Sequence, residues 1–285
     1  DVVLVNPGSR SAVYQQLGDR YSAIEPPSLA GLIATYLARR GLSVEIVDAP
    51  AQNLSPAGVA ETIRDNFEPA LIVMVVYGFQ PSASTQNMTA AGETCAALKA
   101  LRGDWPIMMT GTHPAALPER TLLEEKIHFV CDREGPETIA LTAQALKAGT
   151  RDYSKIPSLW YRDENSGGAG IRSNPPGELM DDLDGEMSGV AWDLLPMKSY
   201  RAHNWHSFEH IHDRQPSVSM HTSLGCPYKC TFCCINAPFG KPSYRLWSPD
   251  SVIRELDLIT GKYGVKNVKF VDEMFVLNRN HVLGI

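Results

Sequence analysis

The stretch Leu71-Ile72-Val73-Met74-Val75-Val76 is the most continuous apolar run in the first half of the chain. A strand without polar alternation is buried on both faces, which is typical of the centre of a parallel sheet. Four further strands are expected at 2–5, 44–48, 106–109 and 127–130, and helices at 28–40, 56–67, 85–101 and 136–146. Five β-then-α units in series require right-handed crossovers and predict an α/β domain with a parallel sheet over residues 1–150.

Loops rich in glycine and small polar residues follow these strands. They are Asn6-Pro7-Gly8-Ser9, Tyr77-Gly78-Phe79, Thr110-Gly111-Thr112-His113-Pro114 and Cys131-Asp132-Arg133-Glu134-Gly135. The carboxyl ends of parallel strands meet at one edge of a sheet, where open α/β folds bind ligands. None of the loops has the pattern G-x-G-x-x-G or G-x4-G-K-S/T, so dinucleotide and P-loop nucleotide binding have no support. The glycines could equally be ordinary turn residues, and His113 an ordinary loop histidine.

Four cysteines lie within the run Cys226-Pro227-Tyr228-Lys229-Cys230-Thr231-Phe232-Cys233-Cys234. The first three have the spacing C-x3-C-x2-C, and three thiolates on one loop can hold three irons of a cubane and leave the fourth iron open. A zinc site needs four ligands and usually a second cysteine pair, but Cys95 and Cys131 lie far upstream. His221 and Cys234 could still complete a zinc tetrahedron. Clustered cysteines in an acidic chain with no signal-peptide pattern favour metal chemistry over disulfides.

The rest of the second half has a β-loop-α-β order. A strand is expected at 217–222, a helix at 248–263 and a strand at 268–273, with the cysteine run after the first strand. Between the two halves, residues 151–215 have a looser pattern, in which Asn165-Ser166-Gly167-Gly168 predicts a hairpin turn. We therefore expect a linker with a small hairpin over 151–215 and a second domain over 216–285.

The cysteine run, with Phe232 before its third cysteine, resembles the signature of the radical S-adenosylmethionine (radical SAM) enzymes. Thr110-Gly111-Thr112-His113-Pro114 and Arg133-Glu134-Gly135-Pro136-Glu137-Thr138 resemble the G-G-x-H-P and G-E-G-E-x-T loops of the cobalamin-binding subgroup, although Thr110, Arg133 and Pro136 depart from the pattern. This resemblance implies a flavodoxin-like (Rossmann-like) cobalamin-binding domain followed by the start of a radical SAM partial (β/α) barrel. We expect the remaining barrel strands to lie beyond Ile285.

The resemblance also implies three cofactors: a 4Fe–4S cluster, S-adenosyl-L-methionine and cobalamin. Cys226, Cys230 and Cys233 would hold the cluster, and Phe232, Asp272 and Glu273 would contact S-adenosylmethionine, although an acidic pair at a strand end can also cap a surface. The implied cobalamin contacts are Asn6, Ser9, Tyr77, Gly78, Phe79, Gly111, Thr112, His113, Glu134 and Gly135. Because no D-x-H-x-x-G motif is present, we expect a buried dimethylbenzimidazole tail, a cobalt without a histidine from that motif, and Tyr77 facing the lower side of the corrin. No catalytic residue is assigned.

The implied activity is a C-methyltransferase, in which a 5′-deoxyadenosyl radical removes hydrogen from an unactivated carbon and methylcobalamin supplies the methyl group. A cyclase or rearrangement enzyme without net methylation, and a non-catalytic protein stapled by a metal, are the alternatives. A methylthiotransferase is disfavoured, because its additional cluster needs three more cysteines than the cysteine run and only Cys95 and Cys131 remain. The implied partners are a small-molecule or peptide substrate and an external electron donor of the flavodoxin or ferredoxin type.

Composition and charge bear on whether the protein spans a membrane or binds nucleic acid. The chain has 285 residues, 44% of them hydrophobic, and a net charge of −6. No segment approaches the roughly 18 consecutive apolar residues of a membrane helix. No block of Lys and Arg is present, which disfavours nucleic-acid binding. We therefore expect a cytoplasmic protein.

Overall fold

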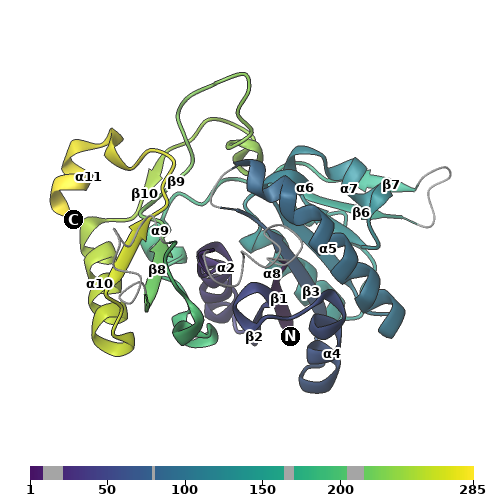
Figure 1. The fold of residues 1–285 in the computed structure, drawn as a ribbon. Coiled ribbons are helices and arrows are strands. Elements are labelled where there is room, and N and C mark those ends of the chain that lie inside the picture. Colours follow the sequence, from purple (N-terminus) through teal and green to yellow (C-terminus); the bar gives the residue numbers. More distant parts are fainter. Residues whose placement is uncertain (9–21, 79–80, 164–169, 204–214) are drawn as a thin grey trace.

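The computed structural model describes residues 1–8, 22–78, 81–163, 170–203 and 215–285. A seven-stranded sheet forms the first half, in the order β2-β1-β3-β4-β5-β6-β7 (Figure 1). Its parallel strands are β1 (Val2–Asn6), β2 (Val44–Asp48), β3 (Leu71–Val76), β4 (Ile107–Gly111) and β5 (Phe129–Cys131). The central position predicted for residues 71–76 is confirmed, because β3 pairs with β1 on one side and β4 on the other.

The hairpin expected in the linker belongs to this sheet. It consists of β6 (Leu159–Arg162) and β7 (Ile171–Ser173), and β6 pairs antiparallel with β5. Trp160 in β6 donates a hydrogen bond from Nε1 to Asp132 Oδ2 at 2.8 Å. The sheet is therefore mixed at this edge, which local sequence pattern did not predict because strand pairing is a long-range property.

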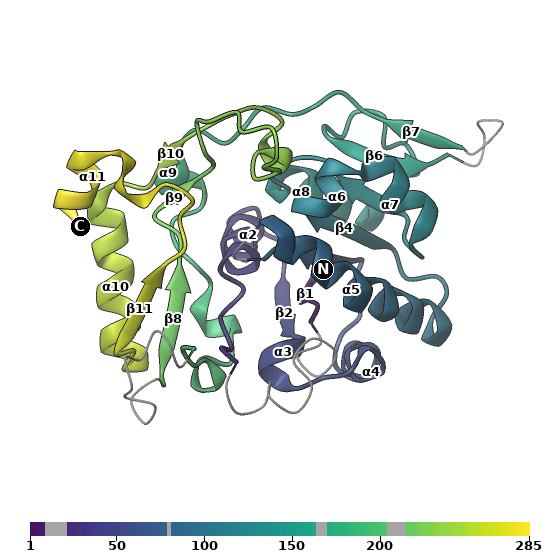
Figure 2. The same cartoon turned by 45° about the horizontal axis from the view of Figure 1, so that its top comes forward.

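Helices cover both faces of the parallel strands, and for this reason β3 is apolar at every position. One face carries α2 (Ser28–Arg39) and α8 (Pro136–Lys147) against Leu71, Val73 and Val75. The other face carries α4 (Pro56–Asn66) and α5 (Pro81–Leu101), which lie side by side against Ile72, Met74 and Val76 (Figure 2). Cys95 on α5 is fully buried in this second core. Short helices α3 (Ala49–Gln52), α6 (Thr112–Ala116) and α7 (Pro118–Glu124) complete the first half.

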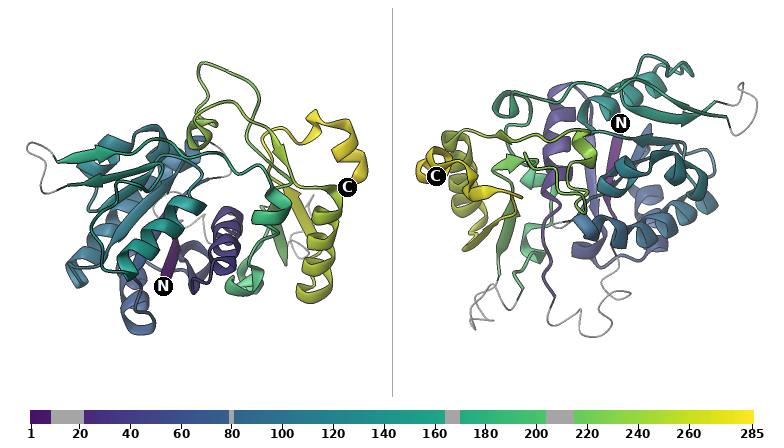
Figure 3. Two further views of the ribbon diagram at one scale, coloured as in Figure 1. Left: turned by 180° about the vertical axis from the view of Figure 1, so that it is seen from behind. Right: turned by 90° about the horizontal axis from the view of Figure 1, so that it is seen from above.

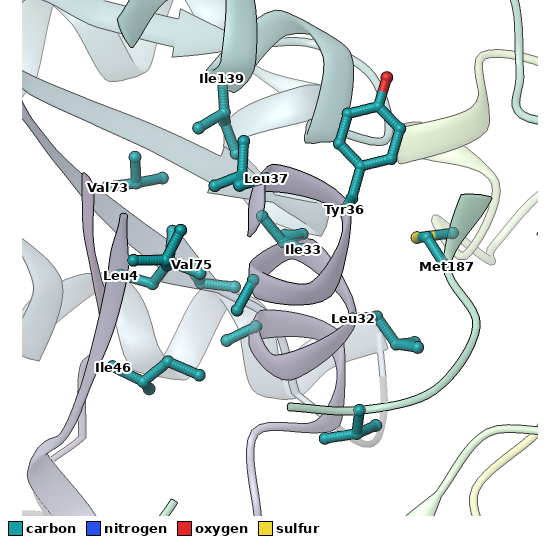
Figure 4. Packing of buried hydrophobic residues seen from close by; sticks show 14 of the residues in the cluster. Leu4, Leu32, Ile33, Tyr36, Leu37, Ile46, Val73, Val75, Ile139 and Met187 are labelled. Atoms are coloured by element: carbon teal, nitrogen blue, oxygen red, sulfur yellow. The ribbon is translucent and has the colours of Figure 1, made fainter. Parts of the chain in front are cut away.

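Helix α2 is buried on two sides. Leu4, Val73 and Val75 lie on its sheet side, and Met187 lies on the opposite side (Figure 4). The covering segment contains α9 (Leu183–Glu186) and the 3-10 turns η1 (Trp192–Leu194) and η2 (Met197–Ser199). It passes so close to α2 that a Cβ atom on Gly31 would lie 2.3 Å from Val190 Cγ1. The segment between the two halves is thus packed into the core.

The second half has the predicted β-loop-α-β order. Strand β8 (Ser217–Met220) pairs in parallel with β11 (Asn267–Phe270), and α10 (Pro249–Tyr263) connects them. The other elements are β9 (Ser223–Leu224), η5 (Ala237–Phe239), β10 (Arg245–Leu246), η6 (Phe275–Leu277) and α11 (Arg279–Gly284). The cysteine run lies between the antiparallel pair β9 and β10, in a loop that arches over to α6 (Figures 1 and 3). In the part of the chain described, no helix is both long and apolar enough to cross a bilayer.

Candidate functional site

The carboxyl end of the sheet faces the second half across a cavity, called here the central cavity. Its lining from the first half includes Tyr77, Gly78, Thr112 and Glu134, and its lining from the second half includes His221, Leu224, Phe239, Val271 and Glu273. Residues separated by up to 244 positions in the sequence, Leu29 and Glu273, therefore meet around one space. This arrangement follows from the parallel topology, which brings the ends of β3, β4 and β5 to a single edge.

A second cavity, called here the side cavity, adjoins the first. Its volume is about 230 Å³, and its lining includes Asn6, Gly8, Ser28, Gln86 and Asn87. Leu29, Tyr77, Gly78 and His221 line both cavities. The two cavities are therefore adjacent parts of one site. Of the residues that they share, Tyr77 comes from the first half of the chain and His221 from the second half.

Two predicted glycines hold the strand ends in close packing. Gly111 has a φ of +131°, and a Cβ atom there would lie 2.1 Å from the carbonyl oxygen of Val76. Gly135 has a φ of +107°, and its Cβ would lie 3.1 Å from Thr110 Oγ1. Side chains at these positions would strain the backbone and push neighbouring strands apart. The turn requirement therefore accounts for both glycines, whether or not a ligand approaches them.

The segment 110–114 is not the loop that we expected. Strand β4 continues to Gly111 and α6 begins at Thr112. Thr112 lines the central cavity, whereas His113 lines neither cavity: its Nδ1 lies 3.0 Å from Thr85 Oγ1, and its backbone N–H donates to Ser84 Oγ at 2.9 Å. Burial lowers the pKa of His113. In this structure His113 therefore packs against α5.

Glu134 lines the central cavity and also joins the two halves. Its Oε1 lies 2.6 Å from Arg245 Nη2, and both side chains are 10% exposed. Its Oε2 accepts a hydrogen bond from the backbone N–H of Met180 at 2.9 Å, and Arg245 Nη1 donates to the carbonyl oxygen of Met180 at 2.7 Å. Arg245 was not among the predicted site residues, because no local pattern links β10 to the end of β5.

The acidic pair after β11 has two different environments. Asp272 Oδ1 accepts hydrogen bonds from the backbone N–H of Thr222 at 2.9 Å and from Ser223 Oγ at 2.5 Å. Strand β8 ends at Met220, two residues earlier than predicted. Glu273 lines the central cavity instead. Desolvation by the surrounding protein, with added repulsion from Asp272, raises the pKa of Glu273 to about 7.

Atoms outside the metal motif hold the cysteine loop. Asn236 Oδ1 accepts from the backbone N–H of Cys226 at 3.3 Å, and Asn236 Nδ2 donates to the carbonyl oxygen of Tyr228 at 3.0 Å. Gly225, with a φ of +85°, permits the turn into the loop, since a Cβ there would lie 2.6 Å from Ser243 Oγ. Asn236 was missed in the sequence, where it follows the motif without an identifiable signal.

The thiols of this loop are accessible. Cys226 is half-buried, Cys230, Cys233 and Cys234 are exposed, and Phe232 is 91% exposed. Three thiols on one short, accessible loop can hold three irons of a cubane cluster. Within the described ranges, no three His, Cys, Asp or Glu side chains converge as a metal site.

The remaining predicted contacts lie near β1 or outside the described residues. Asn6 lines the side cavity and donates from Nδ2 to Asp48 Oδ1 at 2.9 Å. Asp48 Oδ2 in turn accepts from the buried hydroxyl of Tyr200 at 2.7 Å. Ser9 and Phe79 lie outside the described residues.

His221 is the main site residue for which we predicted no ligand-binding role apart from zinc. It follows β8, lines both cavities, and its Nδ1 lies 3.1 Å from Ser28 Oγ at the start of α2. Its position at the carboxyl end of a predicted strand was the available signal.

The chain is similar to several known proteins. Residues 18–143 match the family model described as the B12 binding domain. An uncharacterized methyltransferase of Pyrococcus horikoshii is 30% identical over 285 residues, which is 100% of this chain and 56% of that protein. The hopanoid C-2 methylase of Rhodopseudomonas palustris is 40% identical over 68 residues, or 24% of this chain and 12% of that protein. The chain thus spans about half the length of the relative that it matches throughout.

Two solved structures share the fold. The radical S-adenosylmethionine methyltransferase TsrM of Kitasatospora setae, with tryptophan and an S-adenosylmethionine analogue bound, has a TM-score of 0.69 at 20% identity, covering 99% of this chain and 49% of that chain. The cobalamin-dependent radical enzyme OxsB, with aqua-cobalamin and S-adenosylmethionine bound, has a TM-score of 0.63 at 19% identity, covering 96% of this chain and 34% of that chain. The α/β domain followed by the start of a partial barrel is therefore confirmed as the fold.

Proposed function

We propose that the chain belongs to the cobalamin-dependent radical SAM family and that its protein is a methyltransferase that acts on an unactivated carbon. One observation carries this proposal: Tyr77 and Gly78, at the end of a strand in the B12-binding domain, line the same cavity as Glu273, at the end of β11. A methyl donor and a radical source must reach one substrate atom, and a shared cavity provides that proximity.

The bound cofactors would supply the hard chemistry, namely a 5′-deoxyadenosyl radical from S-adenosylmethionine on the cluster and a methyl group from cobalamin. The chain's own residues would bind and orient these groups. Cys226, Cys230 and Cys233 would ligate iron as thiolates on the loop that Asn236 braces. The carboxylate of Glu273 would accept hydrogen bonds from the ammonium of S-adenosylmethionine.

Two further features support a shared reaction space. The Arg245–Glu134 ion pair fixes the cysteine-bearing half against the sheet. Apolar side chains, including Leu32, Leu224 and Phe239, line the central cavity and would keep water from a reactive site. The predicted contacts of Tyr77, Gly78, Thr112 and Glu134 with cobalamin remain part of the proposal, since all four line that cavity.

The proposal extends to partners and location. The substrate would be a small molecule or a peptide, and reduction of the cluster would require an external donor of the flavodoxin or ferredoxin type. We place the protein in the cytoplasm, because clustered accessible thiols such as Cys230 and Cys233 persist as metal ligands in a reducing compartment.

The test uses the full-length protein purified without oxygen. Iron, sulfide, cobalt and zinc are quantified, and 5′-deoxyadenosine is then measured after addition of S-adenosylmethionine and a reductant. We expect iron, sulfide and cobalt together with production of 5′-deoxyadenosine. Zinc without iron or cobalt would overturn the proposal in favour of a metal-stapled protein. Once a substrate is found, product mass separates methylation, which adds a carbon, from cyclisation or rearrangement, which does not.

A further inference from the structure

The side cavity is lined by polar groups that carry no charge. Asn6, Ser28, Gln86, Asn87 and His221 all line it. Among the described residues around this cavity, Glu25 is the exception, and its Oε1 already pairs with Lys269 Nζ at 2.9 Å. A ligand with an ammonium, carboxylate or phosphate group in this space would require a counter-charge. The lining instead suits a ligand whose edge carries neutral hydrogen-bonding groups.

His221 has one ring nitrogen engaged and one available. Nδ1 lies 3.1 Å from Ser28 Oγ, and within the described part of the chain no hydrogen bond engages Nε2. Burial lowers the pKa of this imidazole to about 4, so the ring is neutral near pH 7. A neutral imidazole held at one nitrogen can exchange one directed hydrogen bond with a ligand through the other.

We propose that His221, oriented by Ser28, is a cobalamin-binding residue that the second half contributes, and that its Nε2 forms a hydrogen bond with a peripheral amide of the corrin. This inference rests on the proposed function. The corrin ring is bordered by neutral amides, which both donate and accept hydrogen bonds, and this chemistry matches the lining of the side cavity. Because His221 follows β8 and Ser28 begins α2, the contact would also make cobalamin binding depend on the docking of the two halves.

The test measures the affinity of the full-length apoprotein for hydroxocobalamin by the change in its visible absorption. His221→Phe preserves an aromatic ring and removes both nitrogens, and we expect its Kd to rise by roughly 3- to 10-fold, the equivalent of about one net hydrogen bond. His221→Gln places an amide near the position of Nε2 and should restore most of the affinity. Ser28→Ala should give a smaller loss in the same direction, because the ring loses its orientation.

His128→Asn is the matched control. His128 is another largely buried histidine with a pKa lowered to about 4 by desolvation, and its Nδ1 accepts from the backbone N–H of Ile107 at 3.0 Å, an acceptor that Asn can replace. His128 lines neither cavity, so the Kd of the His128→Asn variant for hydroxocobalamin should equal that of the wild type. Wild-type affinity in His221→Phe, or equal losses in His221→Phe and His221→Gln with unchanged Tm, would overturn the inference alone. If the wild-type protein fails to bind hydroxocobalamin, the proposed function fails as well.

Discussion

Arg245 in β10 and Glu134 after β5 form an ion pair of 2.6 Å, with each side chain only 10% exposed. The pair joins the cysteine-bearing half to the carboxyl edge of the parallel strands. Arg245 also lies over the ring of Phe239, with Cζ 5.2 Å from the ring centroid. The relative placement of the two halves therefore depends on a charge pair that is largely removed from water.

Glu134→Gln should destabilise the protein by about 3–5 kcal/mol, because it leaves the buried guanidinium of Arg245 without a counter-charge. The double variant Glu134→Met with Arg245→Met should recover much of that loss, since no unpaired charge remains. The control is Arg120→Ala, which breaks a pair with Glu124 whose side chains are 66% and 56% exposed and should cost less than about 1 kcal/mol. Denaturant unfolding measures the free energy of unfolding of all three variants. Equal losses for Glu134→Gln and Arg120→Ala would contradict the prediction.

Cys226, Cys230 and Cys233 should be required for bound iron, whereas Cys234 should not. Replacing the three together with Ala should abolish iron and sulfide binding and leave Tm of the apoprotein nearly unchanged, because these side chains are exposed or only half-buried. Cys234→Ala is the matched control on the same loop and should retain iron. The measurement is the amount of iron bound per protein chain. Loss of iron in Cys234→Ala would show that Cys234 is also a ligand of the metal.

The pKa of about 7 for Glu273 predicts a pH-dependent affinity for S-adenosylmethionine. The carboxyl is mostly protonated at pH 6 and becomes ionised as pH rises, so its attraction for the ligand's ammonium grows. Between about pH 6 and 7.5, below the usual pKa of an α-amino group, the affinity of the iron-loaded protein should increase several-fold. Glu273→Gln should bind weakly with a flat profile; a rising profile in that variant would exclude Glu273 as the titrating group.

Asp272 should affect folding more than ligand affinity. Asp272→Ala removes acceptors for the backbone N–H of Thr222 and the hydroxyl of Ser223, so it should cost about 1–3 kcal/mol. The pH profile of S-adenosylmethionine binding should keep its rise in this variant but at a somewhat lower pH, because desolvation still raises the pKa of Glu273 while the repulsion from Asp272 is lost. Loss of that rise with an unchanged Tm would exchange the roles assigned to Asp272 and Glu273.

Gly111→Ala should be far more harmful than Gly149→Ala. Both glycines have positive φ, +131° and +69°, but a Cβ on Gly111 would lie 2.1 Å from a backbone oxygen, whereas a Cβ on Gly149 would meet nothing within 4 Å. Gly149→Ala carries only backbone strain of about 1 kcal/mol, while Gly111→Ala must also displace β3 from β4. In thermal unfolding, the decrease in Tm for Gly111→Ala should be at least twice that for Gly149→Ala. Equal decreases would show that β3 and β4 move apart at little cost.

The sequence by itself determined the elements that depend on local pattern. The apolar run at residues 71–76 predicted the centre of the parallel strands, and the spacing of Cys226, Cys230 and Cys233 placed three thiols on one loop. Strand burial and motif spacing are properties of a few neighbouring residues, so they can be read without the fold. The same reasoning predicted a glycine-rich ligand edge, and Tyr77, Gly78, Thr112 and Glu134 lie at the central cavity.

Only the tertiary structure decided which side chains hold neighbouring segments together and which line the central cavity. Asp272 and Glu273 are adjacent in sequence, yet one anchors β9 and the other lines the cavity. The Glu134–Arg245 pair and the His221–Ser28 contact span 111 and 193 positions. Local pattern carries no information about partners at such distances, because the docking of β-strands and helices, and not the identity of neighbouring residues, brings these atoms together.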